Sequence, residues 1–258
     1  MGAADSKHPD IRAARRPRLG IIGGSGMDRL EGLELLRREP CDTRWGKPSS
    51  PLLFGRLRGA DLVFLARHGL AHDIPPHAIN YRANIQALAD AGVHEVVAVA
   101  AVGGIGPGME AGTLVVPDQL IDYTWGRAHS FFDGPEVVHI DFTYPYTESL
   151  RQRLLMAGQQ AGLAVHDGGV YGATQGPRLE TAAEIARMAR DGCTLVGMTG
   201  MPEAALAREA GLAYATLAVV ANRAAGLDDA GIRMEEIYAI LETAMGDVRK
   251  LLKLFMNK

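Results

Sequence analysis

Short runs of consecutive apolar residues alternate along the chain with segments in which apolar residues recur every three or four positions. Continuous apolar runs predict strands that are buried on both faces of a sheet, and the wider spacing predicts amphipathic helices. Strands are predicted at residues 19–22, 52–57, 62–66, 95–102, 113–116, 168–173, 194–197 and 212–221. Helices are predicted at residues 80–91, 148–161, 180–190, 202–210 and 234–255.

The order of these elements predicts an α/β fold, because strands that alternate with helices build a sheet with helices on both sides. We expect a three-layer sandwich with a central mixed, largely parallel twisted sheet. The length of 258 residues fits one large core, so residues 17–258 are predicted to form a single domain. Residues 1–16 are polar and basic and are predicted to be a disordered tail.

The composition narrows the class of partners. A net charge of −3 and a pI near 6.2 argue against nucleic acid, because phosphate backbones select basic surfaces. The chain has no apolar run long enough to span a membrane, and its N-terminus lacks the apolar core of a secretory signal. The two cysteines, Cys41 and Cys193, lie far apart, which favours a reduced cytoplasmic protein.

Small residues follow the first predicted strand in the segment Gly23-Gly24-Ser25-Gly26. Their backbone N–H groups can form an anion-binding nest, to which the Ser25 hydroxyl adds a donor. A glycine turn without a ligand is an equally open interpretation. A dinucleotide-binding fingerprint is excluded because Arg29 stands where its third glycine belongs, and Met27 excludes a hydrolase nucleophile elbow.

Arg67 and His68 directly follow the strand predicted at residues 62–66. Arginine presents a planar fork of donors that suits an oxyanion, and histidine can add one more. A surface ion pair is the alternative, but the neighbouring buried strand and glycine favour a ligand. Although His68, His72 and His77 are close in sequence, their loop contains two prolines and no matching carboxylate, so no metal site is predicted.

Three other segments carry candidate contacts. Residues 100–104 have small side chains that would let a ligand approach the main chain, although tight helix packing would use the same residues. Thr199 lies between a strand end and a helix N-terminus, a natural anion site, and the Met198 thioether offers an apolar surface for a ring or sugar. Glu180 could accept a ring N–H, or it could be a first-turn carboxylate favoured by the helix dipole.

These candidate segments share one location, because each lies at a strand end or in the loop that follows. Ligands of open α/β sheets bind at such ends. Ser25, the Arg67-His68 pair and Thr199 together favour a small dianion such as phosphate. The strand that runs from Tyr214 is predicted to end at Asn222, a lone amide placed to meet a ligand where the chain leaves the sheet.

Five motifs taken together resemble the nucleoside phosphorylase family that includes methylthioadenosine phosphorylase and trimeric purine nucleoside phosphorylase. They are Gly20-Ile-Ile-Gly-Gly-Ser-Gly26, Arg67-His68-Gly69, Pro76-His-Ala-Ile-Asn-Tyr-Arg-Ala-Asn84, Gln175-Gly-Pro-Arg178 and Met198-Thr-Gly-Met-Pro-Glu203. The resemblance runs from Arg18 to the C-terminus and is greatest to the bacterial branch that acts on S-methyl-5'-thioinosine. It implies a pentosyltransferase that needs no cofactor and uses inorganic phosphate as a co-substrate.

The resemblance also implies two sets of contacts. Phosphate would be bound by Ser25, Arg67, His68, Ala100, Ala101 (through its backbone) and Thr199. The nucleoside would contact Leu179, Glu180, Met198, Asn222, Arg223, Ala224, Met234 and His139. Relatives often carry a donor at the position of Ala100, so one contact would be missing. His139 resembles a segment that reaches into a neighbouring subunit's 5' pocket, which implies a homotrimer.

The implied reaction is reversible phosphorolysis, in which phosphate attacks C1' of the nucleoside and negative charge grows on the departing purine. Asn222 would stabilise that charge and is the predicted catalytic residue. Family members that cleave 6-aminopurines carry a carboxylate at this position and another at that of Ala224. An ionised carboxylate only accepts hydrogen bonds, whereas an amide can donate to O6, so the sequence favours a 6-oxopurine.

The sequence gives less direct evidence for the substituent on the 5' carbon of the substrate. An apolar pocket of Met234, Ile237 and Tyr238 would favour a methylthio group and hence S-methyl-5'-thioinosine, with hypoxanthine and 5-methylthioribose 1-phosphate as products. His72 and His139 could instead serve a hydroxyl, so inosine and guanosine stay open, and methylthioadenosine is less favoured. A non-catalytic sensor of nucleosides or phosphate is the alternative from another class, although it would not need the full phosphate-binding set.

Overall fold

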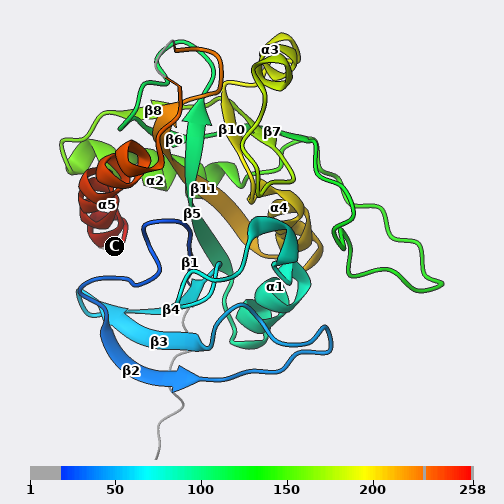
Figure 1. Cartoon of the computed structure of the whole chain (residues 1–258). Helices are drawn as coiled ribbons and strands as arrows, with labels where there is room; N and C mark the ends of the chain where they lie inside the picture. Colours follow the sequence, from blue (N-terminus) through cyan, green and yellow to red (C-terminus); the bar gives the residue numbers. More distant parts are fainter. Residues whose placement is uncertain (1–18, 229–230, 257–258) are drawn as a thin grey trace, which may run out of the picture.

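The computed structural model describes residues 19–228 and 231–256, so the predicted tail of residues 1–16 lies outside the described residues. The described chain forms one eleven-stranded sheet with helices around it (Figure 1). The strands are β1 (Leu19–Gly23), β2 (Glu34–Glu39), β3 (Leu52–Leu57), β4 (Ala60–Ala66), β5 (Glu95–Gly104), β6 (Leu114–Val116), β7 (Gln119–Asp122), β8 (Val165–Asp167), β9 (Val170–Ala173), β10 (Leu195–Gly197) and β11 (Ala213–Arg223). The helices are α1 (Tyr81–Asp90), α2 (Glu148–Gln160), α3 (Ala182–Arg190), α4 (Gly200–Glu209) and α5 (Met234–Phe255), with a 3-10 turn at Pro76–Ala78.

The central strand β5 has partners on both edges. On one edge β11 pairs with it in parallel over residues 95–104, with one irregularity near its end. On the other edge β1 pairs with residues 95–98 and β10 with residues 103–104. Residues 99–102 therefore have no partner strand on that edge within the described part of the chain. The sheet opens at this point, and the opening determines where a ligand can reach the backbone.

Helices cover both faces of the sheet, which confirms the predicted three-layer arrangement. The even-numbered residues of β5 from Val96 to Val102 belong to the core that contains α1 and α4. The odd-numbered Val97 and Val99 belong to the core that contains α2 and α5. Since side chains of a strand alternate between faces, the continuous apolar run of β5 supplies both cores. The sheet is mixed, because parallel pairs at β1, β5 and β11 are combined with antiparallel ones.

Three strands were not predicted, and each lacks a continuous apolar run. All six residues of β2 are exposed, and among the described residues β2 pairs only with β3, at the edge of the sheet. Its two leucines are adjacent and flanked by charged residues, so they point to opposite faces and give the strand no apolar face. β7 is partly buried, and β8 is a three-residue strand whose pairing with β6 is set by long-range contacts. Short strands of this kind depend on their neighbours rather than on their own sequence.

Two predicted element ends are wrong in ways that matter for the site. The strand predicted to end at residue 221 continues to Arg223, so Asn222 lies within β11 rather than beyond it. The helix predicted to begin at residue 180 begins at Ala182. Thr181 is its N-cap, and Thr181 and Glu184 form a reciprocal capping box. Glu180 is thus outside the helix, because the strongest cap available lies one residue later.

Among residues 19–228 and 231–256, no helix combines the length and the apolar character that a membrane crossing requires.

Candidate functional site

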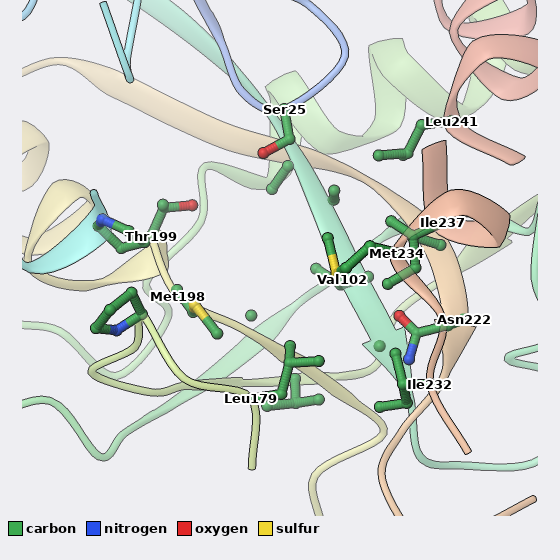
Figure 2. Close-up of a pocket in the computed structure, with 18 of the residues that line it drawn as sticks. Ser25, Val102, Leu179, Met198, Thr199, Asn222, Ile232, Met234, Ile237 and Leu241 are labelled. Carbon is green, nitrogen blue, oxygen red and sulfur yellow. The ribbon is translucent and has the colours of Figure 1, made fainter. Parts of the chain in front are cut away.

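A cavity of about 270 Å³ lies at the opening of the sheet beside β5. Its walls come from β5, β10, β11, the loops that follow β1, β4 and β9, and the first turns of α5 (Figure 2). Twelve residues predicted to bind phosphate or nucleoside line it: Ser25, Arg67, His68, Ala100, Ala101, Leu179, Glu180, Met198, Thr199, Asn222, Ala224 and Met234. The topology therefore gathers segments that are far apart in sequence.

Arg67 forms the most strongly constrained contact of the cavity. Its Nε and one terminal nitrogen donate to both carboxylate oxygens of Glu203 at 2.7 and 2.9 Å, and the other terminal nitrogen donates to the Val99 carbonyl at 2.9 Å. Arg67 is 1% exposed and Glu203 is fully buried. Burial opposes the charge of Arg67, but the adjacent carboxylate outweighs it and raises the pKa. These three hydrogen bonds use three of the five N–H groups of Arg67, which also lines the cavity.

Gly24 makes this placement of Arg67 possible. A Cβ atom at residue 24 would lie 2.5 Å from the Val99 carbonyl oxygen and 2.8 Å from a terminal nitrogen of Arg67. Both distances are shorter than a side chain tolerates, so the turn after β1 can approach β5 only with glycine at this position. The glycine of the motif is thus explained by a close approach to the cation.

His68 is a neutral side chain beside Arg67. Burial and, to a smaller extent, the charge of Arg67 together lower the pKa of His68 to about 4. Its Nδ1 lies 2.9 Å from the Ile74 carbonyl oxygen. A carbonyl only accepts, so the neutral ring carries its proton on Nδ1 and is left with an acceptor at Nε2. This differs from the expectation that His68 adds another donor, because the backbone fixes the tautomer.

Two hydroxyl groups complete this end of the cavity. Ser25 follows β1, and Thr199 immediately precedes α4 without capping it through its side chain. Figure 2 shows both hydroxyls directed into the space between them. The Val99 carbonyl faces the open edge of β5. Because backbone groups two residues apart in a strand point to the same edge, the Ala101 N–H faces the opening as well.

Asn222 lies at the opposite end, on a β-bulge of β11. The register between β11 and β5 shifts at Ala221, so that Asn222 is opposite Gly103. Bulges redirect side chains, and here the Asn222 amide points into the cavity (Figure 2). One of its N–H groups donates to the Arg223 carbonyl at 2.6 Å, which leaves the second N–H and the Oδ1 acceptor for a ligand. The neighbouring Ala224 is buried and carries no carboxylate.

Glu180, Leu179 and Met198 form the wall between these two ends. Because Glu180 precedes the helix, the alternative that it is a first-turn carboxylate is wrong, and Glu184 occupies that role instead. The Thr174 hydroxyl donates to Glu180 at 2.7 Å and orients it. Met198 packs tightly on the chain at Gly176, where a Cβ atom would lie 2.5 Å from the methionine sulfur.

The remaining wall is apolar and comes from α5. Met234, Ile237 and Tyr238 line it as predicted, together with Ile232 and Leu241. Figure 2 shows Met234, Ile237 and Leu241 on the same side of the cavity as Asn222, across from Met198 and Thr199. His72 also lines the cavity, and its Nδ1 lies 2.8 Å from Asp28. An apolar substituent and a polar one could therefore both find contacts at this side.

Two predicted contact residues lie away from the cavity. The Arg223 guanidinium donates to the carbonyls of Ile105, Gly106 and Met109 and so secures the loop that follows β5. This result argues against a direct contact between Arg223 and the nucleoside. His139 is exposed in the extended segment between β7 and α2. That segment projects from the body of the chain in Figure 1, and His139 is not among the residues that line the cavity.

Glu203 is the main site residue for which the sequence predicted no role. It lies 136 positions from Arg67, and its Oε1 also accepts from the Tyr214 hydroxyl at 2.8 Å. A charged residue in the first turn of a helix would ordinarily be attributed to the helix dipole. Its apolar neighbours in α4, where residues 200 to 207 are all buried, were the available signal.

The histidine-rich loop does not gather metal ligands in the structure. Within residues 19–228 and 231–256, no group of three histidine, cysteine, aspartate or glutamate side chains could hold a metal ion.

The phosphorylase superfamily matches the chain over residues 18–257. A probable S-methyl-5'-thioinosine phosphorylase of Pseudomonas syringae pv. tomato is 55% identical over 90% of this chain and 95% of the relative. The 6-oxopurine nucleoside phosphorylase of Pyrococcus furiosus is 42% identical over 92% of this chain and 91% of its own. The solved methylthioadenosine phosphorylase of Schistosoma mansoni in complex with adenine is 31% identical, with a TM-score of 0.89 over 93% of this chain and 91% of the other.

Proposed function

The chain belongs to the phosphorylase superfamily, and from this premise we propose that it catalyses the reversible phosphorolysis of S-methyl-5'-thioinosine. The products are hypoxanthine and 5-methylthioribose 1-phosphate. One observation carries the proposal: a single cavity joins a preassembled anion site to an amide, not a carboxylate, at its far end. The names of the bacterial relatives at 51–55% identity support the same substrate.

Phosphate is the nucleophile in this proposal and binds at the end formed by Ser25, Arg67, His68 and Thr199. Arg67 and the hydroxyls donate to it, and the Nε2 acceptor of His68 takes the hydrogen of a protonated phosphate oxygen. No side chain has to form a covalent intermediate, because the C1'–N9 bond of the nucleoside breaks as a phosphate oxygen bonds to C1'. The protein holds both reactants in line, which lowers the entropic part of the barrier.

Asn222 stabilises the departing purine. Its free N–H donates to O6 of hypoxanthine, and its Oδ1 accepts the N7–H that forms as the departing purine takes up a proton from water. A donor of this kind acts where charge develops during the reaction, so it lowers the barrier rather than only binding the substrate. Glu180 accepts the N1–H of a 6-oxopurine, whereas N1 of adenine carries no hydrogen. Both contacts select the same class of base.

The α5 wall gives the preference at the 5' carbon. Met234, Ile237 and Leu241 bury the methylthio group of the substrate in this proposal. A general 6-oxopurine nucleoside phosphorylase is the second candidate, because the His72–Asp28 pair on the same side could bind the 5' hydroxyl of inosine or guanosine. Its support from relatives is weaker, at 42% identity.

The proposal includes a cytoplasmic homotrimer with shared sites. The two free cysteines suit a reducing compartment. His139, together with its neighbours Val137 and Val138, which are 78% and 37% exposed, provides a surface for a second subunit. Light scattering in solution would give about three times the chain mass of 27.6 kDa, and a stable monomer would contradict this part.

The reaction is tested by measuring phosphate-dependent release of the base from four nucleosides: S-methyl-5'-thioinosine, inosine, guanosine and methylthioadenosine. The proposal predicts the highest kcat/KM for S-methyl-5'-thioinosine. Higher kcat/KM for inosine would favour the second candidate. Tight binding of a purine nucleoside without any phosphate-dependent turnover would favour a non-catalytic sensor and contradict the enzyme proposal.

A further inference from the structure

Arg127 lies in the segment between β7 and α2, outside every motif discussed above. It is partly buried, yet among the described residues it forms no ion pair with a carboxylate. Its guanidinium instead donates only to neutral oxygens. An arginine that is held by neutral oxygens alone orders the surrounding chain rather than balancing a charge, because its planar fork fixes the direction of each hydrogen bond.

The guanidinium joins two loops of the cavity. One terminal nitrogen donates to the carbonyls of Met198 and Met201 at 2.9 and 2.5 Å. The other donates to the carbonyls of Thr174 and Gln175 at 3.2 and 2.8 Å. The first pair of carbonyls brackets Thr199, and the second pair immediately precedes the loop that carries Leu179 and Glu180.

Two more hydrogen bonds fix the orientation of the fork. Its Nε donates to the side-chain oxygen of Gln175 at 3.1 Å, and a terminal nitrogen donates to the Tyr81 hydroxyl at 3.1 Å. The guanidinium also lies 5.3 Å from the centre of the Tyr81 ring. The Tyr81 side chain is 3% exposed, so the Arg127 guanidinium is hydrogen-bonded to a residue of the core as well as to both loops.

We propose that Arg127 is a positioning residue for the phosphorolysis: its guanidinium fixes the spacing between the loop that holds the base and the segment that holds phosphate. This inference rests on the proposed function. Glu180 meets the purine and Thr199 meets the phosphate, so their separation sets the line of attack at C1'. A displacement of about 1 Å in such a geometry can lower the rate about 100-fold.

The test compares Arg127→Met with Arg82→Met. Arg82 is a matched control, because it binds the same segment through Ser130 and Asp133 but contacts neither cavity loop. We expect Arg127→Met to lower kcat/KM about 100-fold, with KM raised for both phosphate and nucleoside, and Arg82→Met to change it less than about threefold. Equal effects of the two variants would overturn the inference.

The variants Arg127→Lys and Arg127→Ala test whether the planar guanidinium of Arg127 is needed or only its positive charge. Lysine keeps the charge but cannot reach four carbonyls in fixed directions, so we expect Arg127→Lys to lose most of the activity. Millimolar guanidinium should restore Arg127→Ala several-fold, whereas methylammonium should not. Full activity of Arg127→Lys, or no difference between the two ions, would show that the fork has no positioning role.

Hydrogen exchange does not depend on catalysis, so it tests this inference separately from the proposed function. Hydrogen exchange should speed up in residues 174–180 and in residues 198–201 of Arg127→Met, and in neither segment of Arg82→Met. If the wild-type protein releases no base from any nucleoside, the proposed function fails while the exchange result still decides whether Arg127 orders both loops. Unchanged exchange in the two segments would overturn the inference even in an active enzyme.

Discussion

The proposed phosphate end of the cavity and its α5 wall are built in different ways. At the phosphate end the decisive side chains are buried, and their partners lie far away in sequence, as Arg67 and Glu203 do across 136 positions. At the α5 wall, Met234 and Tyr238 are 45% and 62% exposed and contact the cavity through apolar atoms. The side chains proposed to bind phosphate are thus held by buried hydrogen bonds, whereas those of the α5 wall are largely exposed.

In the proposed function, the buried phosphate end determines the class of reaction, and the α5 wall determines the preference for the 5' substituent of the substrate. A buried, hydrogen-bonded cation suits a co-substrate that never changes, because any displacement of Arg67 would leave Glu203 as an unpaired buried charge. An apolar wall discriminates a methylthio group from a hydroxyl only modestly, because each methylene adds about 1 to 3 kcal/mol at most. Asn222 is intermediate in character, because its side chain is half-buried but donates a hydrogen bond to a backbone carbonyl.

The largest expected effect is the loss of the buried ion pair. Arg67→Met leaves the Glu203 carboxylate buried without its cation, so the free energy of unfolding should fall by about 3 to 5 kcal/mol. Urea denaturation would measure this change. The double variant Arg67→Met/Glu203→Gln should recover most of the stability but none of the phosphorolysis. Equal stability of single and double variants would show that the pair does not hold this end of the cavity.

Because His68 is buried in its neutral form, the free energy of unfolding should depend on pH. The pKa of His68 is about 4 in the folded chain and about 6.5 in the unfolded one, so the unfolded state binds more protons between these values. The folded state is therefore destabilised as pH falls from 6.5 to 4, by roughly 3 kcal/mol for this residue. His68→Gln should flatten that part of the stability curve and leave stability near pH 8 almost unchanged. An unaltered slope in urea titrations from pH 4 to 7 would contradict the assignment.

The α5 wall should show the smallest effect. Met234→Ala removes apolar contacts from an exposed side chain, so kcat/KM for S-methyl-5'-thioinosine should fall about tenfold while that for inosine changes little. Tyr238→Phe is the matched control, since it keeps the apolar surface. Parallel losses for both nucleosides would mean that Met234 does not contact the 5' substituent.

The same contrast explains what the sequence could and could not predict. Ser25, Arg67, His68 and Thr199 were identified because each follows a buried strand, and the strand ends meet at one opening of the sheet. The role of Glu203 was not predicted, since nothing local shows that a first-turn carboxylate faces an arginine more than a hundred residues away.

Element ends account for the remaining differences. The bulge at Ala221, which turns Asn222 into the cavity, depends on pairing with β5 and leaves no trace in the apolar run itself. Glu180 lies outside α3 because Thr181 is the N-cap of that helix. The sequence therefore predicts most of the residues that line the cavity, whereas the directions in which their side chains point depend on the packed sheet.

The central claim is that the Asn222 amide reads the 6-position of the purine. It is tested most directly by the ratio of kcat/KM for S-methyl-5'-thioinosine to that for methylthioadenosine, measured in the wild-type protein and in Asn222→Asp. We predict a wild-type ratio of about 1000 or more, because the wrong base leaves buried polar groups unpaired, and a fall of at least about 100-fold in Asn222→Asp. A wild-type ratio near one, or a ratio that the substitution leaves unchanged, would contradict the account.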